Sequence, residues 1–250
     1  MVRMRCSWLA LFGGFALLVL GTASPAERPT VRVAVAANFL GTLQSLRPAF
    51  EATHPFSLSF SSGSTGMLYA QVRSGAPFEI LLAADEDRPA QLERDGLIVP
   101  GSRFTYAIGR LVLWRPNATI AGDQALLLPG RIAIADPALA PYGVAALDFL
   151  ERSGRLEAVD DRLVRGASVS QAYQFVGSRA AAMGLVALAQ VLDEPVSSRW
   201  IVPADRHVPI RQQAVLLRPT GGARALVAFL QSDEAQAAIE ARGYDRGTPP

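Results

Sequence analysis

Most of this chain repeats one unit, in which a buried apolar strand is followed by a short loop of small residues and then by an amphipathic helix. The pattern predicts strands over residues 31–37, 56–60 and 78–83, with helical spacing of apolar residues after each. Pro48 lies inside the first helical pattern, so we expect it to kink that helix or to limit it to about two turns. Alternating strands and helices with short links are typical of a parallel sheet flanked by helices, which predicts an α/β fold.

A second series of strands predicts a second lobe. These strands are expected over residues 106–115, 131–135, 163–167, 181–187, 200–202 and 213–217. We expect the last strand and the two helices that follow it, at residues 223–231 and 234–242, to belong to the first lobe. The chain would then cross twice between lobes, with a cleft between them. The predicted divisions are a signal peptide (1–26), the first part of lobe 1 (27–109), lobe 2 (110–204) and the return to lobe 1 (205–250).

The first 26 residues have the layout of a secretory signal peptide. Arg3 and Arg5 precede an uncharged, mostly apolar run over residues 7–23, and small residues follow it. A membrane anchor is the alternative, but the run is short for a span and ends in small residues rather than in charges. We therefore expect cleavage after Ala23 or Ala26 and export of the mature chain.

Charge and composition exclude several classes of function. The formal net charge is +2, and loss of the signal peptide removes two arginines and no acid, which leaves the mature chain neutral. No run of arginines remains that would indicate a nucleic-acid partner. The chain contains no lysine, so it has neither a P-loop lysine nor a Schiff-base lysine. Its single cysteine and two histidines provide neither a disulfide framework nor a histidine-rich metal site.

Four loops share one setting, because each follows a predicted strand, consists mainly of small or hydroxyl residues and opens a helix. They are residues 37–38, 62–66, 140–143 and 168–169. In open α/β sheets, ligands bind beyond the carboxyl ends of the strands. Helix N-termini present unpaired N–H groups and a partial positive charge there. Several such loops that converge would bind an anion without any charged side chain.

Each loop also has a simpler interpretation. Asn38 is a good N-cap residue and could serve only to start its helix. Residues 61–66 could be a solvated loop, Tyr142 a turn residue at the surface and Val169 a core residue. Only the shared strand–loop–helix setting connects these positions.

The sequence offers little support for an enzyme. It contains no G-x-S-x-G, H-E-x-x-H or C-x-x-C pattern. Asp85 and Asp136 each end a predicted strand and could act as the general base of a secreted enzyme that uses the same cleft. Aspartates at such positions more often cap the following turn, which is the interpretation we favour.

Several stretches resemble the periplasmic molybdate-binding proteins of ABC importers, over essentially the whole mature length. They are V-A-V-A-A-N-F (33–39), S-S-G-S-T-G-M-L-Y-A-Q-V (61–72), S-G-A-P-F-E-I-L-L-A-A-D (74–85), I-A-D-P-A-L-A-P-Y-G (134–143) and an apolar return strand before the last helices. The resemblance implies a two-lobed, type II periplasmic binding protein fold. Each lobe would be a mostly parallel sheet flanked by helices, with a two-stranded hinge between the lobes.

The resemblance also implies a tetrahedral dianion held in the cleft by neutral donors. The positions that match family ligands to the oxyanion, rather than to a bare metal ion, are Asn38, Ser64, Tyr142 and Val169, the last through its backbone N–H. The repeated serines leave Ser61 and Ser62 open as alternatives to Ser64. Some relatives have a tyrosine ligand where this chain has Ala187, so we infer that the Tyr142 hydroxyl takes over that role.

The function implied is capture of molybdate, and of tungstate, by a monomeric periplasmic protein that delivers the ion to a membrane ABC permease. No cofactor, enzyme activity or nucleic-acid partner is expected. A site of donors without a carboxylate disfavours protonated phosphate by about 1–3 kcal/mol, because the phosphate O–H would be unpaired. Sulfate is fully ionised, so only the size of the cleft can reject it. The alternatives are a receptor for sulfate or thiosulfate, the secreted enzyme described above, and a ligand-sensing module that regulates a partner.

Overall fold

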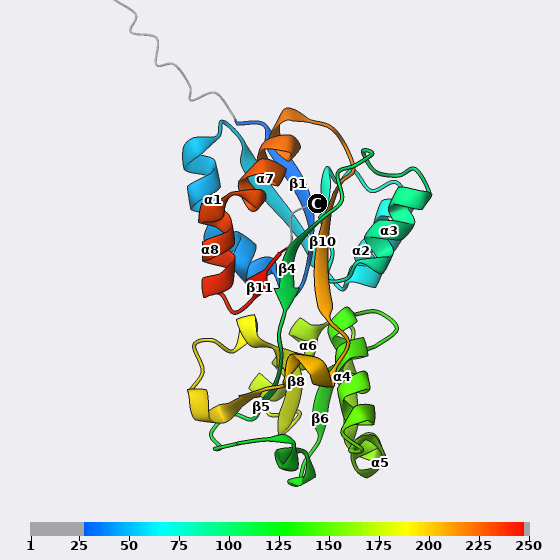
Figure 1. The fold of residues 1–250 in the computed structure, drawn as a ribbon, viewed down its shortest axis with the longest axis vertical. Helices are drawn as coiled ribbons and strands as arrows, with labels where there is room; N and C mark the ends of the chain where they lie inside the picture. The colour runs from blue at the N-terminus through cyan, green and yellow to red at the C-terminus, as the bar shows by residue number, and fades with distance from the viewer. Residues whose placement is uncertain (1–27, 248–250) are drawn as a thin grey trace, which may run out of the picture.

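The computed structural model describes residues 28–247 and shows two α/β lobes stacked along the long axis of the molecule (Figure 1). The predicted signal peptide, residues 1–26, lies outside the described residues. Within residues 28–247, no helix is both long enough and apolar enough to cross a membrane. The α/β class predicted from the sequence is confirmed.

The first lobe is built on a six-stranded sheet in the order β11-β4-β10-β3-β1-β2. Its strands are β1 (Thr30–Ala36), β2 (Ser57–Gly63), β3 (Ile80–Leu82), β4 (Phe104–Gly109), β10 (Ile210–Leu216) and β11 (Asp245–Arg246). Figure 1 shows three helices on one face, namely α1 (Leu40–Thr53), α7 (Gly221–Gln231) and α8 (Asp233–Ala241). The opposite face carries α2 (Thr65–Arg73) and α3 (Asp87–Arg94).

The second lobe is built on a five-stranded sheet in the order β7-β6-β8-β5-β9. Its strands are β5 (Leu111–Trp114), β6 (Ile132–Ala135), β7 (Leu163–Gly166), β8 (Met183–Ala187) and β9 (Arg199–Ile201). Its α-helices are α4 (Pro141–Arg152), α5 (Leu156–Val159) and α6 (Val169–Gly177). Short 3-10 helices occupy connections at η1 (Asp123–Leu127), η2 (Asp160–Arg162), η3 (Leu188–Gln190), η4 (Val196–Ser198) and η5 (Ala204–Arg206).

Each sheet is mixed rather than mostly parallel. In the first lobe β1 pairs in parallel with β2 and β3, and in the second lobe β6 pairs in parallel with β7 and β8. The remaining pairings, which involve the strands that lead into and out of the lobe junction, are antiparallel. The parallel trio in each lobe sends its carboxyl ends toward one edge, which is where a ligand is expected.

The chain crosses between the lobes at two adjacent points. The sequence predicts one strand over residues 106–115, but the structure divides it into β4 of the first sheet and β5 of the second, with the break at Arg110. The returning strand β10 begins at Ile210, which pairs with Gly109. The two crossings therefore lie side by side, as Figure 1 shows for β4 and β10.

The expectation that Pro48 limits the helix to about two turns is wrong, because α1 continues for 14 residues with Pro48 inside it, whereas a kink at Pro48 stays a prediction. The carbonyl that loses its helical hydrogen bond is that of Gln44, four residues earlier. Gln44 and Pro48 are both on the exposed face, so water can solvate that carbonyl. Meanwhile Leu46 and Phe50 are buried against the sheet and hold the helix on both sides of the proline.

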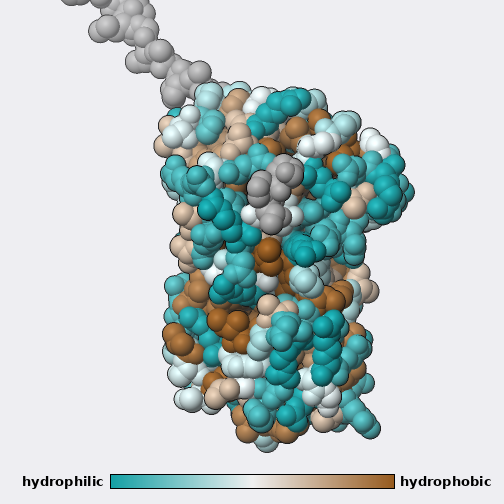
Figure 2. Space-filling model, viewed as in Figure 1, coloured by the Kyte–Doolittle hydropathy of each residue, from teal (hydrophilic) through white to brown (hydrophobic). Residues whose placement is uncertain are grey.

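Exposed apolar side chains are distributed over both lobes. Met67 of α2, Val144 of α4 and Val196 of η4 are between 44 % and 75 % exposed. On the face seen in Figure 2, hydrophilic residues predominate and apolar residues form small separate groups. The apolar groups form no continuous apolar surface on that face.

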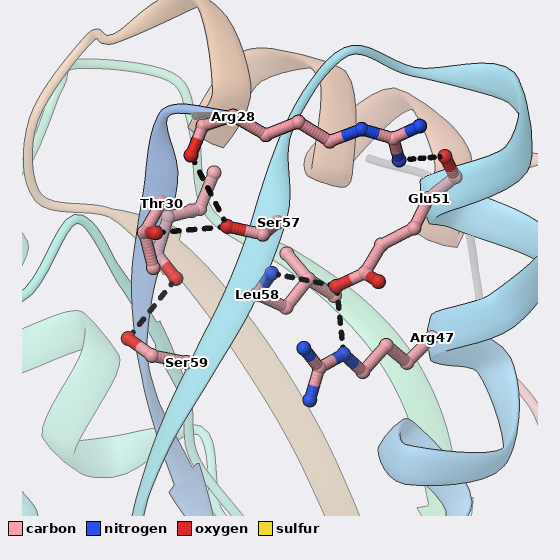
Figure 3. A network of polar contacts seen from close by, with 8 residues as sticks. Arg28, Thr30, Arg47, Glu51, Ser57, Leu58 and Ser59 are labelled. Atoms are coloured by element: carbon pink, nitrogen blue, oxygen red, sulfur yellow. Dashed lines mark hydrogen bonds and ion pairs between the residues drawn. The ribbon is translucent and has the colours of Figure 1, made fainter. Parts of the chain in front are cut away.

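A polar network ties α1 to the edge strand of the first sheet (Figure 3). Glu51 Oε1 accepts hydrogen bonds from Arg47 Nε at 2.7 Å and from the Leu58 backbone N–H at 2.9 Å. Arg28 donates to the Glu51 carbonyl at 2.7 Å. Burial raises the pKa of the Glu51 carboxyl, but the hydrogen bonds from Leu58 and Arg47 outweigh it, so the pKa lies below its ordinary value.

We expect Glu51→Gln to lower the free energy of unfolding at neutral pH by about 0.5–1 kcal/mol, because the amide loses the charge-assisted bond to Arg47. A carboxyl with a lowered folded pKa stabilises above its unfolded pKa and loses this effect as the pH falls through the folded value. The difference from the unmodified protein should therefore shrink below about pH 4. Urea unfolding across pH tests this, with exposed Glu240→Gln as control; a difference that persists unchanged in acid would contradict it.

Candidate functional site

A small cavity lies between the lobes, at the carboxyl ends of β1 and β2 on one side and of β6 and β7 on the other. Its lining residues are Ala36, Ala37, Asn38, Gly63, Ser64, Thr65, Ala84, Ala140, Pro141, Tyr142, Ser168 and Val169. The cavity is narrow, and residues of both lobes line it. All four residues predicted from the sequence are among the lining residues, so the structure brings them together.

Asn38 follows β1 and is 4 % exposed. The N-cap position of α1 is occupied by Phe39 without a side-chain hydrogen bond, so the interpretation of Asn38 as a helix cap is wrong. Asn38 Nδ2 instead donates to Gln212 Oε1 at 2.8 Å and to Tyr244 Oη at 3.3 Å. The competing acceptors on these two neighbours draw the side chain away from the helix end.

Ser64 is the N-cap of α2 and is 2 % exposed, so it does not belong to a solvated loop. Its Oγ accepts from the Met67 N–H at 3.4 Å, which leaves the hydroxyl proton available as a donor. Ser61 and Ser62 lie within β2 and are exposed, because the pairing of β1 with β2 continues to Gly63. Of the three serines, only Ser64 lines the cavity.

Tyr142 is the second residue of α4, after Pro141 at the first helical position. Its side chain is 1 % exposed, so it is not a surface turn residue. Its buried Oη has no hydrogen-bond partner within residues 28–247. Burial raises the pKa of the Tyr142 phenol well above its ordinary value, which keeps the hydroxyl neutral and able to donate a proton.

Val169 is the first residue of α6, and its side chain packs in the core of the second lobe. The core interpretation is thus correct for the side chain. Its backbone N–H belongs to the first turn of α6, where N–H groups have no intrahelical acceptor. Ser168 caps the helix by accepting from the Gln171 N–H at 3.2 Å, and both residues line the cavity.

No charged side chain lines this cavity. Asp85 lines a neighbouring groove, where it pairs with Arg88 and accepts from the Arg88 N–H. Burial raises the pKa of Asp85, although Arg88 opposes the rise. Asp136 accepts from the Ala138 N–H at 2.9 Å and so caps its turn. Neither aspartate is a general base facing the cavity, and residues 28–247 contain no group of three metal-ligating side chains.

Three residues behind the cavity were missed by the sequence reasoning. Gln212, Tyr106 and Tyr244 are buried and hydrogen-bonded to Asn38 or to one another. Tyr106 lies within an apolar pattern that predicts only core packing, and Tyr244 follows the last predicted helix among charged residues. Gln212 lies directly before the strand predicted at residues 213–217, so the pattern does not mark it as a buried glutamine in need of hydrogen-bond partners.

The family model that describes bacterial extracellular solute-binding proteins matches residues 31–245. The chain belongs to this family. The resemblance stated from the sequence is thereby confirmed at the level of the family, and the two-lobed fold is the one shared by its structural neighbours.

Two relatives of this solute-binding protein match nearly its whole length. The molybdate-binding protein ModA of Azotobacter vinelandii is 43% identical over 232 residues, covering 89% of this chain and 92% of that protein. ModA of Rhodobacter capsulatus is 41% identical, covering 91% of this chain and 92% of that protein. The solved periplasmic molybdate-binding protein of Azotobacter vinelandii superposes with a TM-score of 0.80 at 40% identity, over 86% of this chain and 98% of that chain.

Direct hydrogen bonds join the two lobes of the solute-binding protein beside the cavity. They run from the Gly66 N–H to the Leu139 carbonyl (3.0 Å), from Arg88 Nη2 to the Ala138 carbonyl (3.3 Å) and from Ser170 Oγ to the Ala37 carbonyl (3.1 Å). Gln190 Nε2 donates to Ser170 Oγ at 2.9 Å and supports the last of these. The structure therefore represents the lobes in contact, closed over the cavity.

We expect Gly66→Ala to hold the lobes apart. A Cβ at Gly66 would lie 3.0 Å from the Leu139 carbonyl oxygen, across the lobe junction. This distance is too short for an ordinary van der Waals contact, and separation of the two lobes would relieve it. The matched control is Gly41→Ala, at the same position of α1, where a Cβ meets nothing within 4 Å. Small-angle scattering should show a larger radius of gyration for Gly66→Ala alone, with thermal stability retained. Equal radii for the two variants would contradict the prediction.

Proposed function

We propose that this protein captures molybdate in the cavity between its lobes and delivers it to a membrane ABC permease. The observation that carries the proposal is the cavity, which is lined from both lobes by hydroxyl groups and helix starts and by no charged side chain. It is supported by relatives over about nine-tenths of the chain that are named molybdate-binding proteins.

The donors suit a buried dianion. A buried anion needs a hydrogen bond to each of its oxygens. We assign the side-chain donors to the Ser64 and Tyr142 hydroxyls and the backbone donors to the N–H groups of Asn38 and Val169. Asn38 acts through its backbone because its Nδ2 group is engaged by Gln212 and Tyr244. Helix starts supply partial positive charge without an arginine.

Selectivity follows from the same donor set. Protonated phosphate would leave an O–H without an acceptor, at a cost of about 1–3 kcal/mol. Tungstate has the charge and shape of molybdate, so we expect it to bind comparably. Sulfate has the same charge in a smaller ion and must be rejected by size. A receptor for sulfate or thiosulfate is therefore the alternative that binding measurements must exclude.

The proposal includes the setting of the protein. Residues 1–26 direct export, and the mature protein acts in the periplasm as a monomer without a cofactor. Molybdate shifts the lobes toward the closed arrangement, which the permease recognises. An enzyme that uses this cleft is not favoured, because Asp85 and Asp136 lie outside the cavity and are engaged elsewhere.

Titration calorimetry of the mature protein tests the proposal. We expect heat from molybdate and tungstate, and little from sulfate or phosphate. Ser64→Ala and Tyr142→Phe should each weaken molybdate binding by roughly 10- to 100-fold, since each removes one hydrogen bond to a charged group. Ser62→Ala and Tyr69→Phe, which alter residues outside the cavity, are the controls. Absence of molybdate heat, or unchanged affinity in both site variants, would reject the assignment.

We expect the affinity for molybdate to change by less than about threefold between about pH 7 and pH 9. Tyr142 is the one titratable residue of the cavity lining, and burial raises its pKa, so its hydroxyl stays protonated throughout this range. Ionisation would remove a donor and place a negative charge against the anion. Calorimetry in buffers of matched ionic strength measures the effect, and a steady loss of affinity over this range would show that Tyr142 ionises.

A further inference from the structure

The returning strand β10 carries two neighbouring buried glutamines close to the lobe junction. Gln212 is 0 % exposed and Gln213 is 7 % exposed. The pairing of β10 with β4 shifts between them, so that Tyr106 is an extra residue in β4, which is a β-bulge. The Gln213 side chain forms hydrogen bonds with the side chains of Arg103 and Thr105. The Gln212 side chain forms hydrogen bonds with those of Tyr106 and of Asn38, which lines the cavity.

Counting protons determines which way the Gln212 amide points. The Tyr244 hydroxyl donates its single proton to the Asn38 carbonyl at 2.8 Å. The Asn38 side-chain atom that faces Tyr244 Oη must therefore be a donor, namely Nδ2. This Nδ2 also lies 2.8 Å from Gln212, so the atom of Gln212 that it meets is the acceptor Oε1. Gln212 Nε2 consequently points in the other direction.

Gln212 Nε2 and Tyr142 Oη both lie close to Gly109, one on strand β10 and the other on helix α4. Both atoms are buried, and neither has a hydrogen-bond partner within residues 28–247. A Cβ at Gly109 would clash with both, at 2.8 Å from Gln212 Nε2, so the absence of a side chain there leaves room for them. Burial raises the pKa of Tyr142 and the Gln212 side chain opposes the rise, which is the effect of a donor beside the phenol oxygen.

We propose that Gln212 is a positioning residue for the bound oxyanion. Its Nε2 donates a hydrogen bond to Tyr142 Oη from the side opposite the cavity, so that the Tyr142 hydroxyl proton points toward the cavity. The Tyr142 hydroxyl has one proton. If its oxygen accepts a hydrogen bond from Gln212, this proton remains available to donate to an oxygen of the bound anion. The same amide holds Asn38 through Oε1. One side chain thus orients a cavity residue from each lobe. The inference rests on the proposed function, since an anion must receive the proton.

The arrangement links the donor set to closure of the lobes. Gln212 belongs to β10 of the first sheet, whereas Tyr142 belongs to α4 of the second lobe. Separation of the lobes moves Tyr142 away from Gln212 and lets its hydroxyl turn toward water. Closure restores the contact, so the hydroxyl is directed at the ligand only in the closed arrangement.

Gln212→Met and Gln213→Met form a matched pair, because both remove a buried glutamine from the same strand. We expect Gln212→Met to weaken molybdate binding by about tenfold and Gln213→Met by less than about threefold. In a Tyr142→Phe background, Gln212→Met should cost less than about threefold, since no hydroxyl remains to be oriented. Calorimetry gives the affinities, and urea unfolding of each variant gives its stability.

A second variant keeps the test decisive if Gln212→Met does not fold. Gln212→Glu retains an oxygen for Asn38 and Tyr106 and replaces the donor facing Tyr142 by an acceptor. Its loss of affinity should be partly relieved by Tyr142→Phe, whereas simple charge repulsion would be the same in both backgrounds. Equal losses for Gln212→Met and Gln213→Met, or losses additive with Tyr142→Phe, overturn the inference. Failure of the unmodified protein to bind molybdate overturns the proposed function instead.

Discussion

The structure is organised by the need to present N–H and O–H groups, rather than charges, to one small enclosed space. Parallel pairing of β1 with β2 and of β6 with β7 sends the strand ends of each lobe to the junction, and the following helices begin there. Backbone N–H groups at helix starts are unpaired in any case. If these N–H groups are the ligands, as we propose, the empty site contains no buried cation, in contrast to a site built from arginines.

The hinge is what allows this site to be assembled from two rigid halves. Each lobe has its own apolar core, and the principal clusters centre on Leu113 and Ile134 in one lobe and on Val33 and Phe50 in the other. The two crossings between the lobes pair with each other at Gly109 and Ile210. We therefore expect motion of the lobes to occur where the strands change sheets, and the geometry within each lobe to be preserved.

The sequence predicts the parts of this site that depend on local pattern. The loops that contain Ser64 and Val169 are predicted because a strand, a run of small residues and a helix start can be identified along the chain, whereas the choice of these two residues comes from the resemblance. Asn38 was assigned two competing roles, and the structure excludes the cap because two partners distant in sequence, Gln212 and Tyr244, draw its side chain away. Such partners cannot be identified from spacing, since they depend on which strands become neighbours.

The prediction of one continuous strand over residues 106–115 is wrong for a related reason. Both of its halves are apolar and extended, so nothing in the local pattern marks Arg110 as the point where the chain leaves one sheet for the other. The division depends on the two-lobed topology, and the room needed at Gly109 depends on Tyr142 and Gln212 reaching it from elsewhere. The residues that we propose to position the ligand donors thus depend on tertiary packing, whereas the loops that carry the proposed donors follow from secondary structure.

Under the proposed function, rejection of sulfate would depend on how closely the lobes approach when they close. Sulfate and molybdate carry equal charge, so only the distance between donors of opposite lobes can separate them. That distance is set by the protein, because the Gly66–Leu139 and Ser170–Ala37 hydrogen bonds form directly between lobes and determine how closely they approach. An ion too small for the closed cavity leaves buried donors unpaired, at about 1–3 kcal/mol each. An ion too large prevents these bonds from forming, so the interlobe contacts limit ligand size from both sides.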